Sequence, residues 1–90
     1  MPTVQLKIYG EVQGVFFRAS AKSVAIRLGI TGWIKNTHEG NVEALANGEE
    51  KAVEEFIEWC RQGPEKSRVT KVDVSNVAHV SFEDFEIIRR

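Results

Sequence analysis

The hydrophobic pattern of this chain switches from a period of two residues to a helical period, and this switch constrains the fold most. Apolar and polar residues alternate over residues 4–8, which predicts a half-buried strand. An apolar stripe with helical spacing then runs from about Phe17 to Leu28. Gly29 follows, where helices commonly end in a left-handed cap. We therefore expect a strand and a helix joined by a glycine-containing turn.

The same switch occurs again further along the chain. Residues 31–36 and 42–47 are predicted to be two strands of a hairpin, joined by a short loop that contains glycine. A second helical stripe covers residues 52–60. Further strands are predicted near residues 69–77 and 85–87. The order is β-α-β-β-α-β with an added terminal strand, which is typical of a split β-α-β sandwich.

This topology predicts where one polar side chain lies. The second strand of the hairpin is expected between the first two strands, so those two run parallel and end at the same edge of the sheet. The turn after the first strand and Asn36 then meet at that edge. Asn36 shares its parity with Ile34, so it is expected to face the helices. Asn47, with Glu50 three residues later, predicts a capping pair at the start of the second helix.

The size and charge of the chain exclude several classes of protein. Its 90 residues predict a single domain, residues 1–90. A net charge of −1 argues against a partner that is nucleic acid or an anionic membrane. The one cysteine, Cys60, lies on an apolar helical stripe and suits a reducing compartment. With no signal peptide and no long apolar run in the sequence, we expect a cytoplasmic protein and, by default, a monomer.

The turn between the first strand and the first helix, GEVQGVFFR at residues 10–18, has the composition of an anion site. A helix start offers backbone N–H groups without partners, and Gly14 allows them to curl inward as a nest. Arg18 sits at the positive end of the helix dipole, at a cost of about 0.3–1 kcal/mol that a bound anion would reverse. The alternative is that Arg18 is a solvated surface charge. Phe17 belongs to the core stripe, and Phe16 is expected to shield the turn.

Other phosphate-binding motifs and a general base are absent from the sequence. The turn lacks the Lys-Ser/Thr pair of a P-loop and the three-glycine spacing of a dinucleotide site. His38 and His79 are isolated and expected at the surface, and no zinc-ligand spacing occurs. A site of this kind can hold a phosphoryl group and position water, but it cannot protonate a poor leaving group. Acyl phosphates fit, because their carboxylate leaving group has a conjugate-acid pKa of about 4.

Two long motifs resemble the signatures of the acylphosphatase family, in the expected order. The first is an aliphatic residue followed by Gly-x-Val-Gln-Gly-Val-x-Phe-Arg, here Ile8, Gly10, Val12, Gln13, Gly14, Val15, Phe17 and Arg18. The second is found here as Gly32, Trp33, Ile34, Lys35, Asn36, Gly40, Val42 and Gly48. Ile34 is bulkier than the usual residue, which is a conservative departure. The resemblance covers nearly the whole chain.

This resemblance implies a ferredoxin-like α+β sandwich, with an antiparallel sheet and two helices on one face. It also implies a metal-independent hydrolase that cleaves the carboxyl–phosphate bond of small acyl phosphates without a cofactor or a phosphoenzyme. Inorganic phosphate would be the product or a competitive inhibitor. The phosphoryl group would be bound by Arg18 and by the backbone N–H groups of Gln13, Gly14, Val15, Phe16, Phe17 and Arg18. Asn36 would orient the attacking water, and a phosphate oxygen of the substrate would take its proton.

Two alternatives of other classes share this topology. An RNA-binding domain would carry stacking aromatic residues on a central strand, but residues 42–47 contain none. A non-catalytic module that binds phosphate or carbamoyl phosphate remains open. The presence of both Arg18 and Asn36 favours catalysis, because binding alone would not require the amide.

Overall fold

A computed structural model describes residues 1–89 of the chain, so residue 90 of the predicted domain lies outside the described residues. The elements follow in the order β1 (Thr3–Glu11), α1 (Phe17–Leu28), β2 (Thr31–Asn36), β3 (Val42–Asn47), α2 (Glu50–Gln62), β4 (Arg68–Asn76) and β5 (Phe85–Ile88). The predicted strands and helices are confirmed to within a few residues at their ends. Gly29, with φ 74°, is the left-handed cap of α1, as its position predicted.

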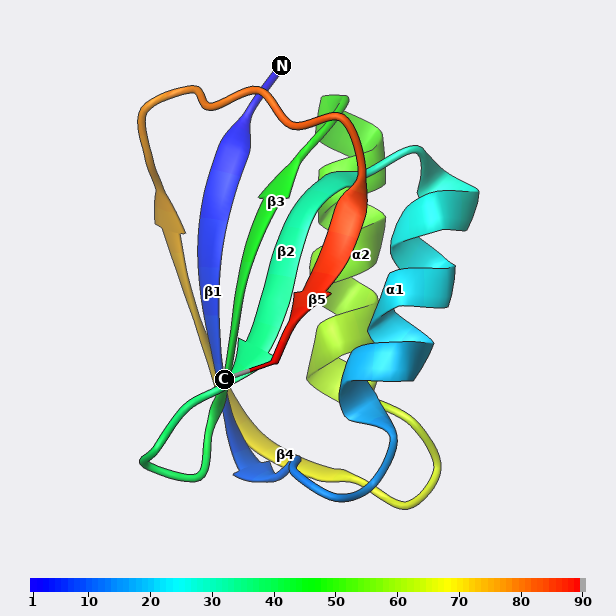
Figure 1. Cartoon of the computed structure of the whole chain (residues 1–90), viewed down its shortest axis with the longest axis vertical. Helices are drawn as coiled ribbons and strands as arrows, with labels where there is room; N and C mark the ends of the chain where they lie inside the picture. Colours follow the sequence, from blue (N-terminus) through cyan, green and yellow to red (C-terminus); the bar gives the residue numbers. More distant parts are fainter. Residues whose placement is uncertain (90) are drawn as a thin grey trace.

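The strands form one five-stranded sheet in the order β4-β1-β3-β2-β5, with both helices on one face (Figure 1). The β4–β1, β1–β3 and β3–β2 pairs are antiparallel, whereas β5 pairs with β2 in parallel. The chain crosses the end of the sheet after β4 and reaches the far edge, so β5 runs alongside β2 in the same direction (Figure 1). The ferredoxin-like sandwich is confirmed, and the added β5 makes its otherwise antiparallel sheet mixed.

The core lies between the sheet and the two helices. Phe17 and Phe56 are its largest fully buried side chains. The ring centroid of Phe17 lies 5.3 Å from that of Trp59, and the ring centroid of Phe56 lies 5.7 Å from that of Phe85. Burial of a side chain of this size stabilises the fold by about 1.5–3 kcal/mol. Cys60 is also fully buried, and desolvation raises the pKa of its thiol, so it is a core residue as expected.

The predicted capping pair at the start of α2 is wrong. The N-cap is Glu49, which makes no side-chain capping hydrogen bond. Asn47 is instead the last residue of β3, where the register places it opposite Thr3. The Thr3 hydroxyl donates a hydrogen bond of 3.1 Å to Asn47 Oδ1. The buried side chain of Asn47 therefore satisfies a partner across the sheet rather than a helix end.

Strand register places Asn36 on the face covered by the helices. Val42 of β3 pairs with Ile8 on one side and with Asn36 on the other, so the three residues form one row across the sheet. Ile8 and Val42 are fully buried under the helices. Asn36 thus points to the same face, at the edge where β1 also ends, in agreement with its parity in the sequence. No helix among residues 1–89 combines the length and apolar character that crossing a membrane requires.

Candidate functional site

The connection between β1 and α1 alternates in the sign of its backbone φ angles. Gly14 has φ 75° and Phe16 has φ 64°, whereas Gln13 and Val15 have negative values. Such alternation turns successive N–H groups toward one concave side, which is the geometry of an anion-binding nest. Phe16 is the one non-glycine residue among residues 1–89 with a positive φ. This conformation costs about 1–2 kcal/mol in an L-residue, and such strain is concentrated at functional sites.

The backbone donors of this connection have no partners in the described part of the chain. Phe16 is the N-cap of α1 and makes no side-chain capping bond, and the first turn holds no acidic residue. The first helical bond runs from Ser20 N–H to Phe16 O at 3.0 Å, and the N–H groups of residues 14–19 meet no acceptor within residues 1–89. The positive end of α1 is therefore uncompensated by the described residues, which is the electrostatic condition for binding an anion.

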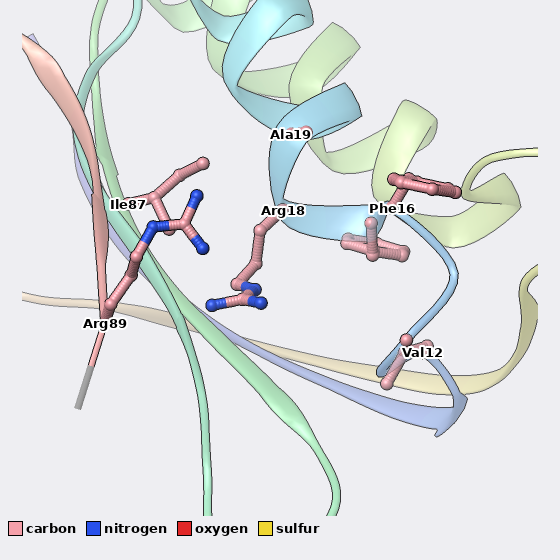
Figure 2. Close-up of a pocket in the computed structure, with 8 residues that line it drawn as sticks. Val12, Phe16, Arg18, Ala19, Ile87 and Arg89 are labelled. Carbon is pink, nitrogen blue, oxygen red and sulfur yellow. The ribbon is translucent and has the colours of Figure 1, made fainter.

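A hollow of about 320 Å³ opens beside this connection. It is lined by Val12, Gly14, Phe16, Phe17, Arg18, Ala19, Ile87 and Arg89. Figure 2 shows Arg18 extending from the first turn of α1 and Arg89 from the chain just after β5, with both guanidinium groups turned into the hollow. Neither arginine forms an ion pair with any of residues 1–89. The hollow is therefore strongly cationic.

The two neighbouring phenylalanines have opposite environments. Phe17 is 1% exposed in the core, as its helical phase predicted, whereas Phe16 is 76% exposed. Phe16 lines the hollow beside the start of α1 and is largely exposed, and the shielding role expected of it stays a prediction (Figure 2).

The side chain of Gln13 ties this connection to the loop that follows β2. Its Nε2 donates hydrogen bonds to the carbonyl oxygens of Thr37, at 2.9 Å, and Asn41, at 2.8 Å. The sequence predicted only a backbone role for Gln13. These bonds join residues 24 and 28 positions apart, so no local pattern indicates them. They hold the β1–α1 connection beside the end of β2, where Asn36 lies.

Asn36 Oδ1 is buried and has no hydrogen-bond partner within residues 1–89. A buried acceptor without a partner costs about 1–3 kcal/mol of stability, so a bound molecule that donates a hydrogen bond to this atom would be stabilised. Asn36 is absent from the lining of the hollow with Arg18. It lines a second hollow, of about 510 Å³, with Lys7, Lys35, Thr37, His38, Glu39 and Glu43. Lys7, Lys35 and Glu43 form a row on the face of the sheet away from the helices. The fold thus brings Arg18 and Asn36 to one edge of the sheet, with each lining a different hollow.

The hollow that Asn36 lines is electrostatically balanced, unlike the hollow with Arg18. Lys7 Nζ lies 3.1 Å from Glu39 Oε1, and Lys35 Nζ lies 3.6 Å from Glu43 Oε1. The hydrogen bond to Glu39 raises the pKa of Lys7. No three His, Cys, Asp or Glu side chains gather as metal ligands among residues 1–89. The lysines of this hollow thus have carboxylate partners, whereas neither arginine of the first hollow has one within residues 1–89.

Comparisons with known proteins place this chain in the acylphosphatase family. The acylphosphatase family model matches residues 4–87. An acylphosphatase from Methylococcus capsulatus is 42% identical over 90 residues, which is 99% of this chain and 98% of that protein. A solved acylphosphatase from Bacillus subtilis superposes with a TM-score of 0.95 at 33% identity, covering 99% of this chain and 100% of that one. An acylphosphatase structure from Coxiella burnetii gives 0.94 at 34% identity, covering 97% and 92%.

Proposed function

Because this chain belongs to the acylphosphatase family, we propose that it hydrolyses the carboxyl–phosphate bond of small acyl phosphates. The products are a carboxylate and inorganic phosphate. The names of the similar proteins and the open, cationic β1–α1 connection both support this activity. The electrostatics of the hollow favour a substrate with a compact, highly charged anionic group.

In this proposal the phosphoryl group occupies the nest at the start of α1. The backbone N–H groups of residues 13–18 donate hydrogen bonds to its oxygens, and Arg18 adds a planar guanidinium that can bind two oxygens at once. The support is the absence of any other acceptor for the N–H groups of residues 14–19 within residues 1–89. The charge that develops in the transition state is then stabilised by donors that are already in place.

The buried, unpaired Oδ1 of Asn36 is the observation that carries the catalytic part of the proposal. A water molecule that donates a hydrogen bond to this atom is held with a lone pair free to attack phosphorus. Attack is in line with the departing carboxylate, and a phosphoryl oxygen of the substrate takes the proton of the water. The carboxylate leaves without protonation because its conjugate acid has a pKa of about 4. No side chain is then needed as a general base.

We further propose that the reaction uses no metal ion or cofactor. Backbone N–H groups and guanidinium donors attract anions rather than cations, so the charge that a metal would supply comes from the protein. Hydrolysis of benzoyl phosphate by protein dialysed against EDTA should proceed at the rate of untreated protein. A rate that returns only when Mg²⁺ or Mn²⁺ is added would refute this part of the proposal.

A cytoplasmic, monomeric enzyme is the simplest state for this proposal. The burial of Cys60 leaves no exposed thiol among residues 1–89 for an intermolecular disulfide. Sedimentation equilibrium should give the mass of a single chain, 10.1 kDa.

Replacement of Asn36 by alanine tests the proposed role of the water. We expect Asn36→Ala to lower kcat for benzoyl phosphate by about 100-fold, the usual effect of losing one group that acts in the transition state. The inhibition constant of inorganic phosphate should change by less than about twofold, because the amide acts on water. Asn76→Ala is the matched control. Asn76 also ends a strand, but it is exposed on β4, the outer strand on the far side of the sheet from β5.

Two outcomes separate this proposal from its alternative. If Asn36→Ala weakens phosphate binding as much as it lowers kcat, Asn36 is a phosphate ligand and the water is positioned otherwise. If the wild-type protein binds phosphate but hydrolyses no acyl phosphate, the chain is a phosphate-binding module instead of an enzyme.

A further inference from the structure

Arg89 lies in the hollow because of the register of β5. This strand pairs in parallel with β2, so that Ile34 stands beside Ile87 and Lys35 beside Ile88. Phe85 is buried and Ile87 half-buried, so alternate residues of β5 face the helices. Arg89 continues this alternation two residues after Ile87. The same register carried one step further brings Arg89 beside the last residue of β2, which is Asn36.

The two arginines enter the hollow from different sides. Arg18 extends from the helix side, next to the nest, and Arg89 extends from the edge of the sheet (Figure 2). No carboxylate is among the described residues that line the hollow. Two like charges that share a hollow repel each other, and an anion bound between them removes this repulsion.

We propose that Arg89 is a second phosphoryl-binding residue, opposite Arg18, and that it makes the site selective for doubly charged anions. This inference rests on the proposed function, in which the phosphoryl group occupies the nest. The nest supplies neutral N–H donors and Arg18 supplies one positive charge. Arg89 supplies the second charge, which matches a phosphoryl group that carries nearly two negative charges at neutral pH.

A pair of inhibitors with the same shape and different charge tests this inference. Sulfate is a dianion and methanesulfonate a monoanion at every working pH. Their dissociation constants are measured by calorimetry on wild type, Arg89→Gln, Arg89→Lys and the control Arg61→Gln. Arg61 is an exposed arginine near the end of α2 that does not line the hollow, so its replacement removes the same charge without changing the lining. Arg89 is itself exposed, so its replacement should leave the fold intact.

We expect Arg89→Gln to weaken sulfate binding by about tenfold, the effect of losing one charged hydrogen-bonding partner. Methanesulfonate binding should weaken by less than about threefold, because Arg18 alone matches its single charge. Arg89→Lys should recover part of the sulfate affinity, and Arg61→Gln should behave as wild type. For benzoyl phosphate, Arg89→Gln should raise KM with a smaller effect on kcat, as expected for loss of binding in the ground state.

Equal weakening of both anions, or unchanged binding of both, would overturn the inference. The calorimetric measurement needs no turnover, so it stands apart from the proposed hydrolysis. If wild type binds sulfate with the predicted dependence on Arg89 but does not hydrolyse benzoyl phosphate, the proposed function fails and the role of Arg89 in binding anions survives. If hydrolysis is normal and the Arg89 variants bind sulfate as tightly as wild type, the proposed function survives and the role of Arg89 in binding anions fails.

Discussion

The two connections that lead from a strand into a helix differ sharply, although both occur in the same sandwich. Both helices carry a cation at their second residue, Arg18 in α1 and Lys51 in α2. The N-cap of α2, Glu49, has an extended backbone, with φ −65° and ψ 152°, and Glu50 places an acid in the first turn. The N-cap of α1, Phe16, is left-handed at φ 64°, and no acid follows it in the first turn.

The two cations also differ in the charges around them. Lys51 lines a shallow surface hollow with three carboxylates of its own helix, those of Glu54, Glu55 and Glu58. Arg18 lines a hollow with another arginine and with no described carboxylate. The positive charge at the start of α2 is thus compensated by carboxylates of α2 itself, whereas the positive charge at the start of α1 is available to a bound anion. A cation in the first turn of a helix therefore indicates an anion site only when the rest of the turn is uncompensated as well.

The largest expected effect comes from removing each of the two cations. Arg18→Ala should lower kcat/KM for benzoyl phosphate by about 1,000-fold or more, as for other arginines that stabilise a transferred phosphoryl group. Lys51→Ala should change it by less than about twofold. Both variants should keep the circular dichroism spectrum of wild type. Similar losses in the two variants would mean that general positive charge, rather than the β1–α1 hollow, attracts the substrate.

A smaller effect is expected from releasing the β1–α1 connection from the loop after β2. Gln13→Ala removes two hydrogen bonds, to Thr37 and Asn41, so the free energy of unfolding should fall by about 1–2 kcal/mol. Because the nest and Asn36 then lose their fixed spacing, kcat should fall by about tenfold. Urea unfolding and steady-state kinetics measure the two quantities. Gln62→Ala, at the exposed end of α2, is the control. Loss of stability at full kcat would show that the tie does not position the site.

The smallest expected effect concerns the two N-caps. Phe16→Gly should raise the free energy of unfolding by about 0.5–1 kcal/mol, because glycine adopts the left-handed conformation without strain. Part of this stabilisation is lost because glycine also increases the conformational entropy of the unfolded chain. Glu49→Gly should lower it by a few tenths of a kcal/mol at most, since the extended N-cap is unstrained and its side chain makes no capping bond. Thermal unfolding of both variants tests the pair. Destabilisation by Phe16→Gly would mean that the left-handed N-cap carries no strain.

Local patterns in the sequence predicted the architecture and part of the candidate site. The spacing of the apolar residues located the strands and helices. The alternation of side chains along β2 placed Asn36 on the face of the sheet that the helices cover. Features that depend on distant partners were not predictable. Asn47 resembled a helix cap because its partner, Thr3, lies 44 residues away. Arg89 follows a strand of only four residues, which is too short for its alternation to predict that Arg89 lines a hollow with residues from the start of α1.

A phosphate titration of the wild-type protein, followed by two-dimensional ¹H–¹⁵N NMR, tests the contrast between the two helix starts most directly. We predict saturable shifts of the backbone amides of residues 14–19, together with the side-chain amide of Asn36. The amides of residues 50–54 at the start of α2 should not move. Shifts of similar size at both helix starts, or no saturable shift at residues 14–19, would contradict the assignment of the β1–α1 connection as the anion site.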